Sequence, residues 1–249
     1  MKTILLLFFL TANFLAAQNI HVVYSNKTSK YTTFQEDLFI VENNSVSIRD
    51  STVVNTFDAK ANNSGNNEAI FFRKEKNHKI TYFKNHKNKV LFNNHLDEKI
   101  FFIEDVLPEM NWNTNHEETK MIAGFLCNKA TLKFRGSNIT AFYSKILKYN
   151  SGPYKFGGLE GLILEIQDDD HPEFNSWIAT IVQENYQLNH KLPNIPDNTK
   201  TISLKDFLVL KNKNSNDQFN KMIGNAPSGV VIKNKKIIRG GIEKKYEWE

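Results

Sequence analysis

Short apolar runs alternate with polar positions along this chain of 249 residues, and polar turns separate them about every eight to twelve residues. Such alternation is typical of half-buried β-strands, because successive side chains point to opposite faces of a sheet. The segments that we predict as single strands are residues 20–25, 69–75, 79–85, 89–94, 99–106, 139–144, 161–166 and 176–184. Their regular spacing favours an antiparallel meander over strand–helix–strand units, so the sequence predicts a mainly β fold.

Two further segments predict paired strands. Residues 37–50 contain two short runs around Asn43 and Asn44, and asparagine tolerates the positive φ of a tight hairpin. Residues 125–135 alternate, and residues 136–138 then predict a turn into the next strand. By parity Leu126, Ala130, Leu132 and Phe134 share one face of this strand, and Cys127, Lys129, Thr131, Lys133 and Arg135 share the other.

The only strong helix signal lies late in the chain. Ser203 followed by Asp206 resembles a capping box, and apolar residues follow at helical spacing through Leu208. A second helical piece is predicted at 219–223. Residues 58–68 predict a polar loop, and the residues after Gly229 predict a hairpin or a tail.

The N-terminus has the layout of a secretory signal peptide. Lys2 precedes an unbroken apolar run at 4–10, and small residues at 16–17 suit cleavage after Ala17. The run is shorter than the roughly 20 residues of a membrane-spanning helix, and no later stretch is long enough to cross a bilayer. We therefore predict a signal peptide at 1–17 and one β-rich domain with a C-terminal tail at 18–249. Export to the periplasm is favoured, with the cell surface and the medium as alternatives.

Charge and cysteine content narrow the classes of function. The formal charge of +5 falls to +4 when Lys2 is removed, and the remaining basic residues are scattered. Together with export, this argues against a nucleic-acid partner. Cys127 is the single cysteine, so no internal disulfide can form, and we expect its thiol to be buried.

The least ordinary stretch is SGPYKFGGLEGLILEI at 151–166. Gly152 and Gly157 have the spacing of a phosphate loop, but the Lys and Ser or Thr that should follow are Gly158 and Leu159. The stretch also leads into a β-like run rather than a helix. A nucleotide site is therefore excluded here, and the glycines are interpreted as a backbone device.

Each part of that device has a predicted role. Pro153 directs the chain, the glycines at 157–158 permit positive φ or a close backbone approach, and Gly161 indicates a bulge or a crossing backbone. The aromatic residues at 154 and 156 then fold onto the sheet. In the run that follows, Leu162, Leu164 and Ile166 are expected on one face, and Ile163 and Glu165 on the other. Leu162 and Leu164 are expected in the core.

These residues resemble the signature of the GLPGLI family, exported proteins of Bacteroidota whose function is unknown. The match covers about 45 residues, and Glu160 replaces the proline of the signature. The resemblance implies a curled antiparallel sheet or half-barrel, here with one or two helices near the C-terminal end, and a structural role for the motif. The motif residues are Gly152, Pro153, Gly157, Gly158, Leu159, Gly161, Leu162 and Ile163, and upstream matches are Gly124, Cys127, Ala130, Arg135, Gly136, Phe142 and Tyr143.

Signals for catalysis are weak. The acidic stretch at 165–173 could bind a hard cation, but its three aspartates, 168–170, are consecutive and not spaced as calcium ligands. The seven histidines form no H-E-x-x-H motif, and no G-x-S-x-G is present. The sequence therefore predicts an exported non-catalytic binding protein without a metal or cofactor. Its curved sheet is expected to present an apolar face to a lipid, peptide or protein partner, that is, to an apolar ligand or an envelope protein. The alternative is a metal-dependent or thiol hydrolase that uses the acidic stretch or Cys127.

Overall fold

The computed structural model describes residues 19–29, 32–41, 44–50, 79–84, 88–97, 99–189, 191–224, 239 and 241–249. The predicted signal peptide, the polar loop at 58–68, the strand at 69–75 and most of the predicted tail lie outside the described residues. In the part of the chain that is described, no helix is long and apolar enough to cross a membrane.

The described residues form one open sheet of twelve strands and one helix. The strands are β1 (Ile20–Ser29), β2 (Thr32–Val41), β3 (Asn44–Arg49), β4 (Ile80–Lys84), β5 (Lys89–Leu96), β6 (Lys99–Val106), β7 (Thr119–Ile122), β8 (Phe125–Phe134), β9 (Ser137–Ser144), β10 (Leu162–Asp168), β11 (Ser176–Glu184) and β12 (Thr201–Ser203). The helix is α1 (Leu204–Gly224). The predicted mainly β class is confirmed.

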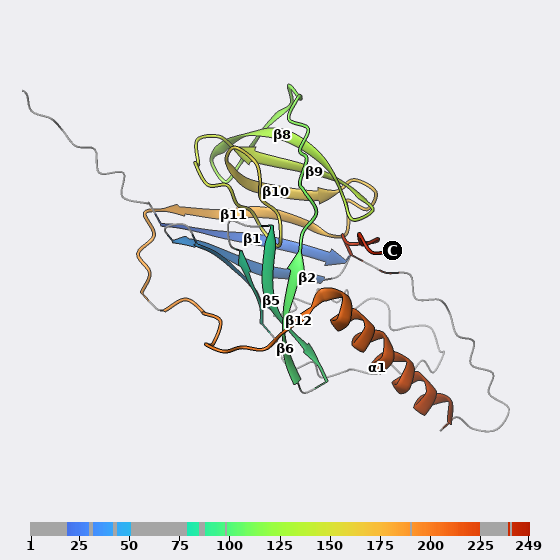
Figure 1. The fold of residues 1–249 in the computed structure, drawn as a ribbon. Coiled ribbons are helices and arrows are strands. Elements are labelled where there is room, and N and C mark those ends of the chain that lie inside the picture. The colour runs from blue at the N-terminus through green and yellow to red at the C-terminus, as the bar shows by residue number, and fades with distance from the viewer. Residues whose placement is uncertain are drawn as a thin grey trace, which may run out of the picture.

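Two antiparallel meanders make up the sheet. One runs in chain order from β1 to β6 and the other from β7 to β11, and the pairing of β1 with β11 joins them. The short strand β12 adds to β6 as the one parallel pair of the described sheet, and α1 follows it beside β6. Figure 1 shows the sheet curling strongly, with β8, β9 and β10 arching over β11 and β1. The predicted curled antiparallel sheet is therefore present, and it does not close into a barrel.

Most element predictions agree with the structure. Strands β2 and β3 pair as the predicted hairpin, and β11 spans 176–184 as expected. Ser203 caps α1, because its Oγ accepts a hydrogen bond from the backbone N–H of Asp206 at 3.1 Å and donates to that carboxylate at 2.7 Å. The helix is continuous, so the piece predicted at 219–223 is its last turn. Strands β7 and β12 were not predicted, since each is only three or four residues long.

The turn between β8 and β9 lies earlier than predicted. Arg135 and Gly136 occupy it with φ of 45° and 82°, and β9 begins at Ser137. This two-residue turn takes Arg135 out of the strand alternation, and its side chain is buried rather than on a polar face.

The predicted faces of β8 are also partly wrong. Leu126 is 50% exposed, whereas Cys127 on the opposite face is fully buried. Ala130, Leu132 and Phe134 of the predicted apolar face are buried as expected, so the buried face of β8 changes between Cys127 and Ala130. A single alternating pattern cannot describe a strand whose buried face changes along its length.

Strand β10 contains a bulge that breaks the predicted alternation. Ile163 pairs with Tyr143 and Glu165 with Phe142, so Leu164 is an extra residue between them. Residues 162–166 are all buried, which confirms the predicted burial of Leu162 and Leu164 but not the division into two faces. The bulge places Ile163 on the same side as Ile166, because their partners on β9 are two residues apart.

The concave side of the sheet is filled by the chain itself. We call residues 145–161, between β9 and β10, the inner loop, and residues 241–249 the C-terminal segment. Leu147, Phe156 and Leu159 of the inner loop belong to the core formed by β1, β2 and β8–β11. Tyr246 of the C-terminal segment packs instead with β4–β6 and α1 in a second core cluster.

Candidate functional site

The first part of the glycine stretch, residues 151–161, lies in the inner loop, and the rest begins β10. The backbone of the inner loop approaches other parts of the chain closely. Gly158 has a φ of 87°, as predicted, whereas Gly157 does not have a positive φ. A Cβ atom on Gly161 would overlap the Ser144 carbonyl oxygen, and one on Gly152 would lie 2.7 Å from the Cβ of Ile163. The loop therefore crosses the end of β9 at a distance that only glycine allows.

Glu36 of β2 holds the inner loop against the sheet. Its buried carboxylate accepts hydrogen bonds from the backbone N–H of Tyr154 at 2.5 Å and from Nε1 of Trp177 at 2.8 Å. The hydroxyl of Ser47 also donates to it. The Tyr154 ring stacks on Trp177 with centroids 5.5 Å apart. One carboxylate thus ties the loop to β2, β3 and β11, and the contact with Tyr154 confirms that this aromatic residue folds onto the sheet.

A buried ionic network holds the other side of the loop. Arg135 lies with its side chain fully buried and donates to both carboxylate oxygens of Asp105 at 2.8 Å and to Glu243 at 2.5 Å. Lys155 donates to Asp105 at 2.7 Å and to Glu243 at 2.9 Å. Glu247 contacts Arg135 at 3.1 Å. The network therefore joins β6, the β8–β9 turn, the inner loop and the C-terminal segment.

The network changes the acidity of its members. Burial raises the pKa of the Asp105 carboxyl, but hydrogen bonds and charge from Arg135 and Lys155 outweigh burial and lower its pKa below the ordinary range. Burial and the nearby Glu243 carboxylate raise the pKa of the Tyr154 hydroxyl well above its ordinary value. Tyr154 therefore stays a donor, and its hydroxyl lies 2.9 Å from Glu243.

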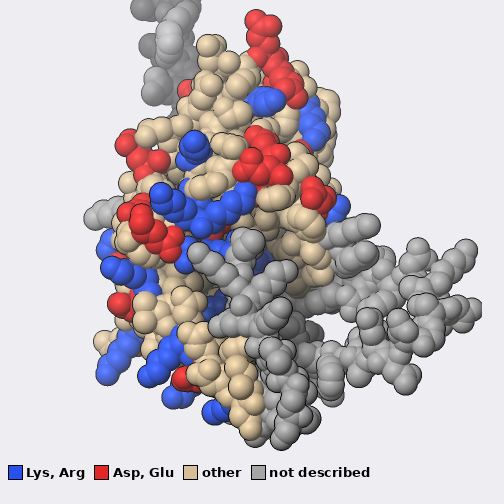
Figure 2. Space-filling view, turned by 90° about the vertical axis from the view of Figure 1, so that its right-hand side faces the viewer, with Lys and Arg blue, Asp and Glu red and all other residues tan. Residues whose placement is uncertain are grey.

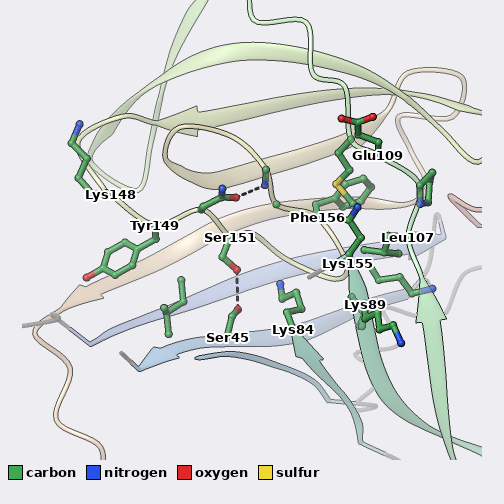
Figure 3. Close-up of a pocket in the computed structure, with 18 residues that line it drawn as sticks. Ser45, Lys84, Lys89, Leu107, Glu109, Lys148, Tyr149, Ser151, Lys155 and Phe156 are labelled. Carbon is green, nitrogen blue, oxygen red and sulfur yellow. Dashed lines mark hydrogen bonds between the residues drawn. The ribbon is translucent and has the colours of Figure 1, made fainter. Parts of the chain in front are cut away.

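A cavity of about 540 Å³ opens beside these contacts. Residues 107–110, 148–151 and 155–158 form one side of it, and residues of β2 to β5 form the other. Figure 3 shows Lys84 rising from β4 beside Ser45 and Ser151, whose hydroxyls are 2.8 Å apart. The volume is in the range of small-molecule sites.

Lys84 is the most unusual group in this cavity. Its ammonium donates to the carbonyl oxygen of Gly152, and no carboxylate of the described residues lies within 4 Å of it. Burial lowers the pKa of Lys84 to about 8, with Glu36 opposing the shift from farther away. By contrast, Lys155, which also lines the cavity, forms ion pairs with Asp105 and Glu243.

The acidic stretch at 165–173 is used in internal contacts. Asp168 is buried and lies 3.0 Å from the Nζ of Lys244, and Asp170 lies 3.1 Å from the same amine. Asp169 accepts from the hydroxyl of Thr140 at 2.9 Å. These contacts fasten the C-terminal segment to the end of β10. No group of three or more His, Cys, Asp or Glu that could hold a metal occurs in the described part of the chain.

The surroundings of Cys127 do not favour a reactive thiolate. It is fully buried, as predicted, and burial together with the Glu165 carboxylate raises its pKa to about 11. At neutral pH the sulfur is therefore a thiol, which is a much weaker nucleophile than a thiolate. Glu165 is itself paired with Lys120 at 2.5 Å.

His21 forms a separate polar cluster on β1. Its Nε2 lies 2.8 Å from Asp37 and its Nδ1 2.9 Å from the side-chain oxygen of Gln183, and its ring stacks on Phe39. Burial lowers the pKa of His21, but the bonds to Asp37 and Gln183 outweigh burial and raise its pKa above the ordinary value of 6.5. The imidazolium, in which both nitrogens donate, is the form that fits both acceptors.

This geometry predicts a pH-dependent contribution of His21 to stability. A raised pKa in the folded state stabilises the protein below about pH 6.5, and this contribution is lost as the pH rises through the folded-state pKa. We expect His21→Gln to lower the free energy of unfolding more at about pH 5.5 than at about pH 8.5. Urea denaturation at both pH values measures the difference, with His171→Gln at an exposed position as control. A larger loss at the higher pH would contradict the assignment.

Charge on the surface is mixed. Figure 2 shows lysine and arginine side chains interspersed with aspartate and glutamate on the face that lies to the right in Figure 1.

Comparison with known proteins adds little to this picture. No family model and no curated protein sequence matches the chain. Two solved structures of PNGF-II, in the P21 and C2 space groups, are similar to it, with 18% and 16% sequence identity and TM-scores of 0.49 and 0.48. The similarity covers 80% of this chain in both cases, and the chain spans about a third of the length of those proteins, 34% and 33%.

Sequence reasoning identified the inner loop but not the residues that surround it. Glu36, Asp105 and Glu243 each occur in ordinary polar positions of the sequence, two of them within strands and one near the C-terminus. Lys84 follows an apolar run and resembles any lysine at the end of a strand. The nearest sequence signal was Arg135, which belongs to the upstream part of the family resemblance but was assigned to a polar face.

Proposed function

We propose that this protein is an exported, non-catalytic binding protein related to the GLPGLI family, and that the cavity beside the inner loop is its ligand site. The observation that carries the proposal is the cavity of about 540 Å³, which holds a lysine ammonium without a carboxylate partner among the described residues. Binding sites combine an apolar wall with a few oriented polar groups, and this cavity has both.

The filled concave side supports the choice of this cavity. The face on which the sequence leads us to expect an apolar ligand is packed against Leu147, Phe156 and Leu159 of the inner loop. A ligand that replaced them would have to remove large apolar side chains from the core, which costs several kcal/mol. The cavity at the edge of the loop requires no such displacement.

A thermal-shift screen tests the proposal. Compounds of neutral, anionic, cationic and zwitterionic classes are added to the mature chain and to Met110→Trp, which places a larger side chain at the cavity wall. We expect at least one compound to raise the melting temperature of the unmodified protein saturably and to have a weaker effect on the variant. Mass spectrometry of the recovered compound checks that it is unchanged. A screen in which no class binds, or in which the compound is hydrolysed, would contradict a non-catalytic ligand site.

A further inference from the structure

Three groups that can bind an oxyanion lie together in the cavity, and we call them its floor: the ammonium of Lys84 and the hydroxyls of Ser45 and Ser151. Lys84 and Ser45 are directly opposite each other in the pairing of β4 with β3, so they stay side by side whatever the loop does. Ser151 of the inner loop brings its hydroxyl within 2.8 Å of the Ser45 hydroxyl. One ammonium and two hydroxyls therefore lie side by side in the cavity (Figure 3).

Among the described residues, the donors at this floor exceed the acceptors to which they are hydrogen-bonded. An ammonium has three N–H donors, and one donates to the Gly152 carbonyl oxygen. The two hydroxyls share one hydrogen bond with each other, which uses the donor of only one of them. An oxygen acceptor of a ligand could satisfy the remaining donors, and a negative charge would interact most strongly with Lys84, since burial already weakens its hydration.

The rest of the cavity lining is mixed. Its polar residues are Asn88, Lys89, Glu109, Lys148, Asn150 and Lys155. Ile40, Val90, Leu107, Met110 and Phe156 form an apolar wall within it. A free inorganic anion would leave this wall in contact with water, whereas a ligand with an apolar body would cover it. The cavity thus offers a cation and an apolar wall to one molecule.

We propose that the cavity binds an amphiphilic oxyanion, a carboxylate or a phosphate ester with an apolar body, and that Lys84, Ser45 and Ser151 hold its charged end. This inference rests on the proposed binding function and names the class of ligand. The lowered pKa of Lys84 supports it, because an anion beside the amine would restore the charged form that burial disfavours.

Isothermal titration with five probes on the unmodified protein tests the proposal. Octanoate and octyl phosphate carry both features, 1-octanol lacks the charge, octylammonium reverses it, and acetate lacks the apolar body. We expect octanoate or octyl phosphate to bind at least about tenfold more tightly than the other three, as expected for a hydrogen bond to a charged group. The tighter of the two oxyanions identifies the headgroup.

Two variants test whether Lys84 causes the higher affinity for oxyanions. Lys84→Gln keeps a donor for the Gly152 carbonyl but removes the charge, so we expect oxyanion affinity to fall about tenfold while octanol affinity is unchanged. Lys79→Met, at an exposed lysine outside the cavity, is the matched control. If Lys84→Gln does not fold, Ser151→Ala replaces it, with a smaller loss of oxyanion affinity expected.

Two results would contradict the proposal of an amphiphilic oxyanion and leave the proposed binding function intact. One is octanol or octylammonium binding as tightly as octanoate and octyl phosphate. The other is the absence of binding by either oxyanion while the thermal-shift screen finds a ligand of another class. If no compound of any class binds, the proposed function itself fails.

Discussion

Arg135→Met is expected to destabilise the protein by about 3–5 kcal/mol, which is the usual cost of breaking a buried ion pair from one side. The guanidinium is the common partner of Asp105, Glu243 and Glu247, and its side chain has no exposed surface. Methionine fills a similar volume but leaves the buried Asp105 carboxylate with Lys155 alone. Backbone strain does not enter the comparison, because both side chains carry a Cβ at the same φ of 45°.

Arg239→Met is the matched control for this variant. Arg239 also makes a bidentate contact with a carboxylate, Glu249, at 2.8 Å, but it is about one-third exposed. Exposed ion pairs contribute about 0–1 kcal/mol, so this change should move the denaturation midpoint little. Urea denaturation of both variants at neutral pH provides the measurement. Equal midpoints for Arg135→Met and the unmodified chain would show that the network does not hold the C-terminal segment in place.

Leu162→Ala is expected to destabilise the protein by about 2–5 kcal/mol, as for other leucines that are removed from a packed core. Leu162 is fully buried and starts β10 immediately after the glycine that crosses Ser144. Its backbone N–H donates to the carbonyl oxygen of Leu147 at 3.0 Å, so the residue also fixes the end of the inner loop. The surrounding backbone is held by these contacts, and the cavity left by the side chain should collapse only partly.

Leu126→Ala provides the comparison within the same sheet. Leu126 is 50% exposed, and changes at such positions usually stay within about 0.5 kcal/mol. Guanidinium denaturation of the two alanine variants gives the contrast directly. If both variants lose the same free energy of unfolding, or Leu162→Ala loses none, then the burial of Leu162 does not stabilise the fold.

The ionic network and the cavity are physically connected. Lys155 donates to Asp105 and Glu243 and also lines the cavity, and the inner loop supplies Ser151 to the cavity floor. Variants that loosen the C-terminal segment are therefore expected to weaken ligand binding as well as stability.

The sequence by itself determined the local elements. Alternation of apolar and polar residues predicted nearly every strand of the described sheet, because the period of two survives wherever one face is exposed. Ser203 and Asp206 predicted the start of α1, since a capping box depends only on residues three positions apart. The glycine stretch could be interpreted as a backbone device because its spacing lacks the lysine of a phosphate loop and it leads into a strand.

Only the tertiary structure decided which face of the sheet each side chain lies on and which distant residue it contacts. The bulge at Leu164 and the burial of Cys127 on the face opposite to Ala130 broke the parity that alternation assigned. The pairing of Arg135 with Asp105 and Glu243 joins residues 30 and 108 positions apart, and no local pattern specifies which distant carboxylate a buried cation will meet. Lys84 became a candidate ligand group for the same reason, because the curl of the sheet and the return of the inner loop, not the neighbours of Lys84 in sequence, enclose its amine.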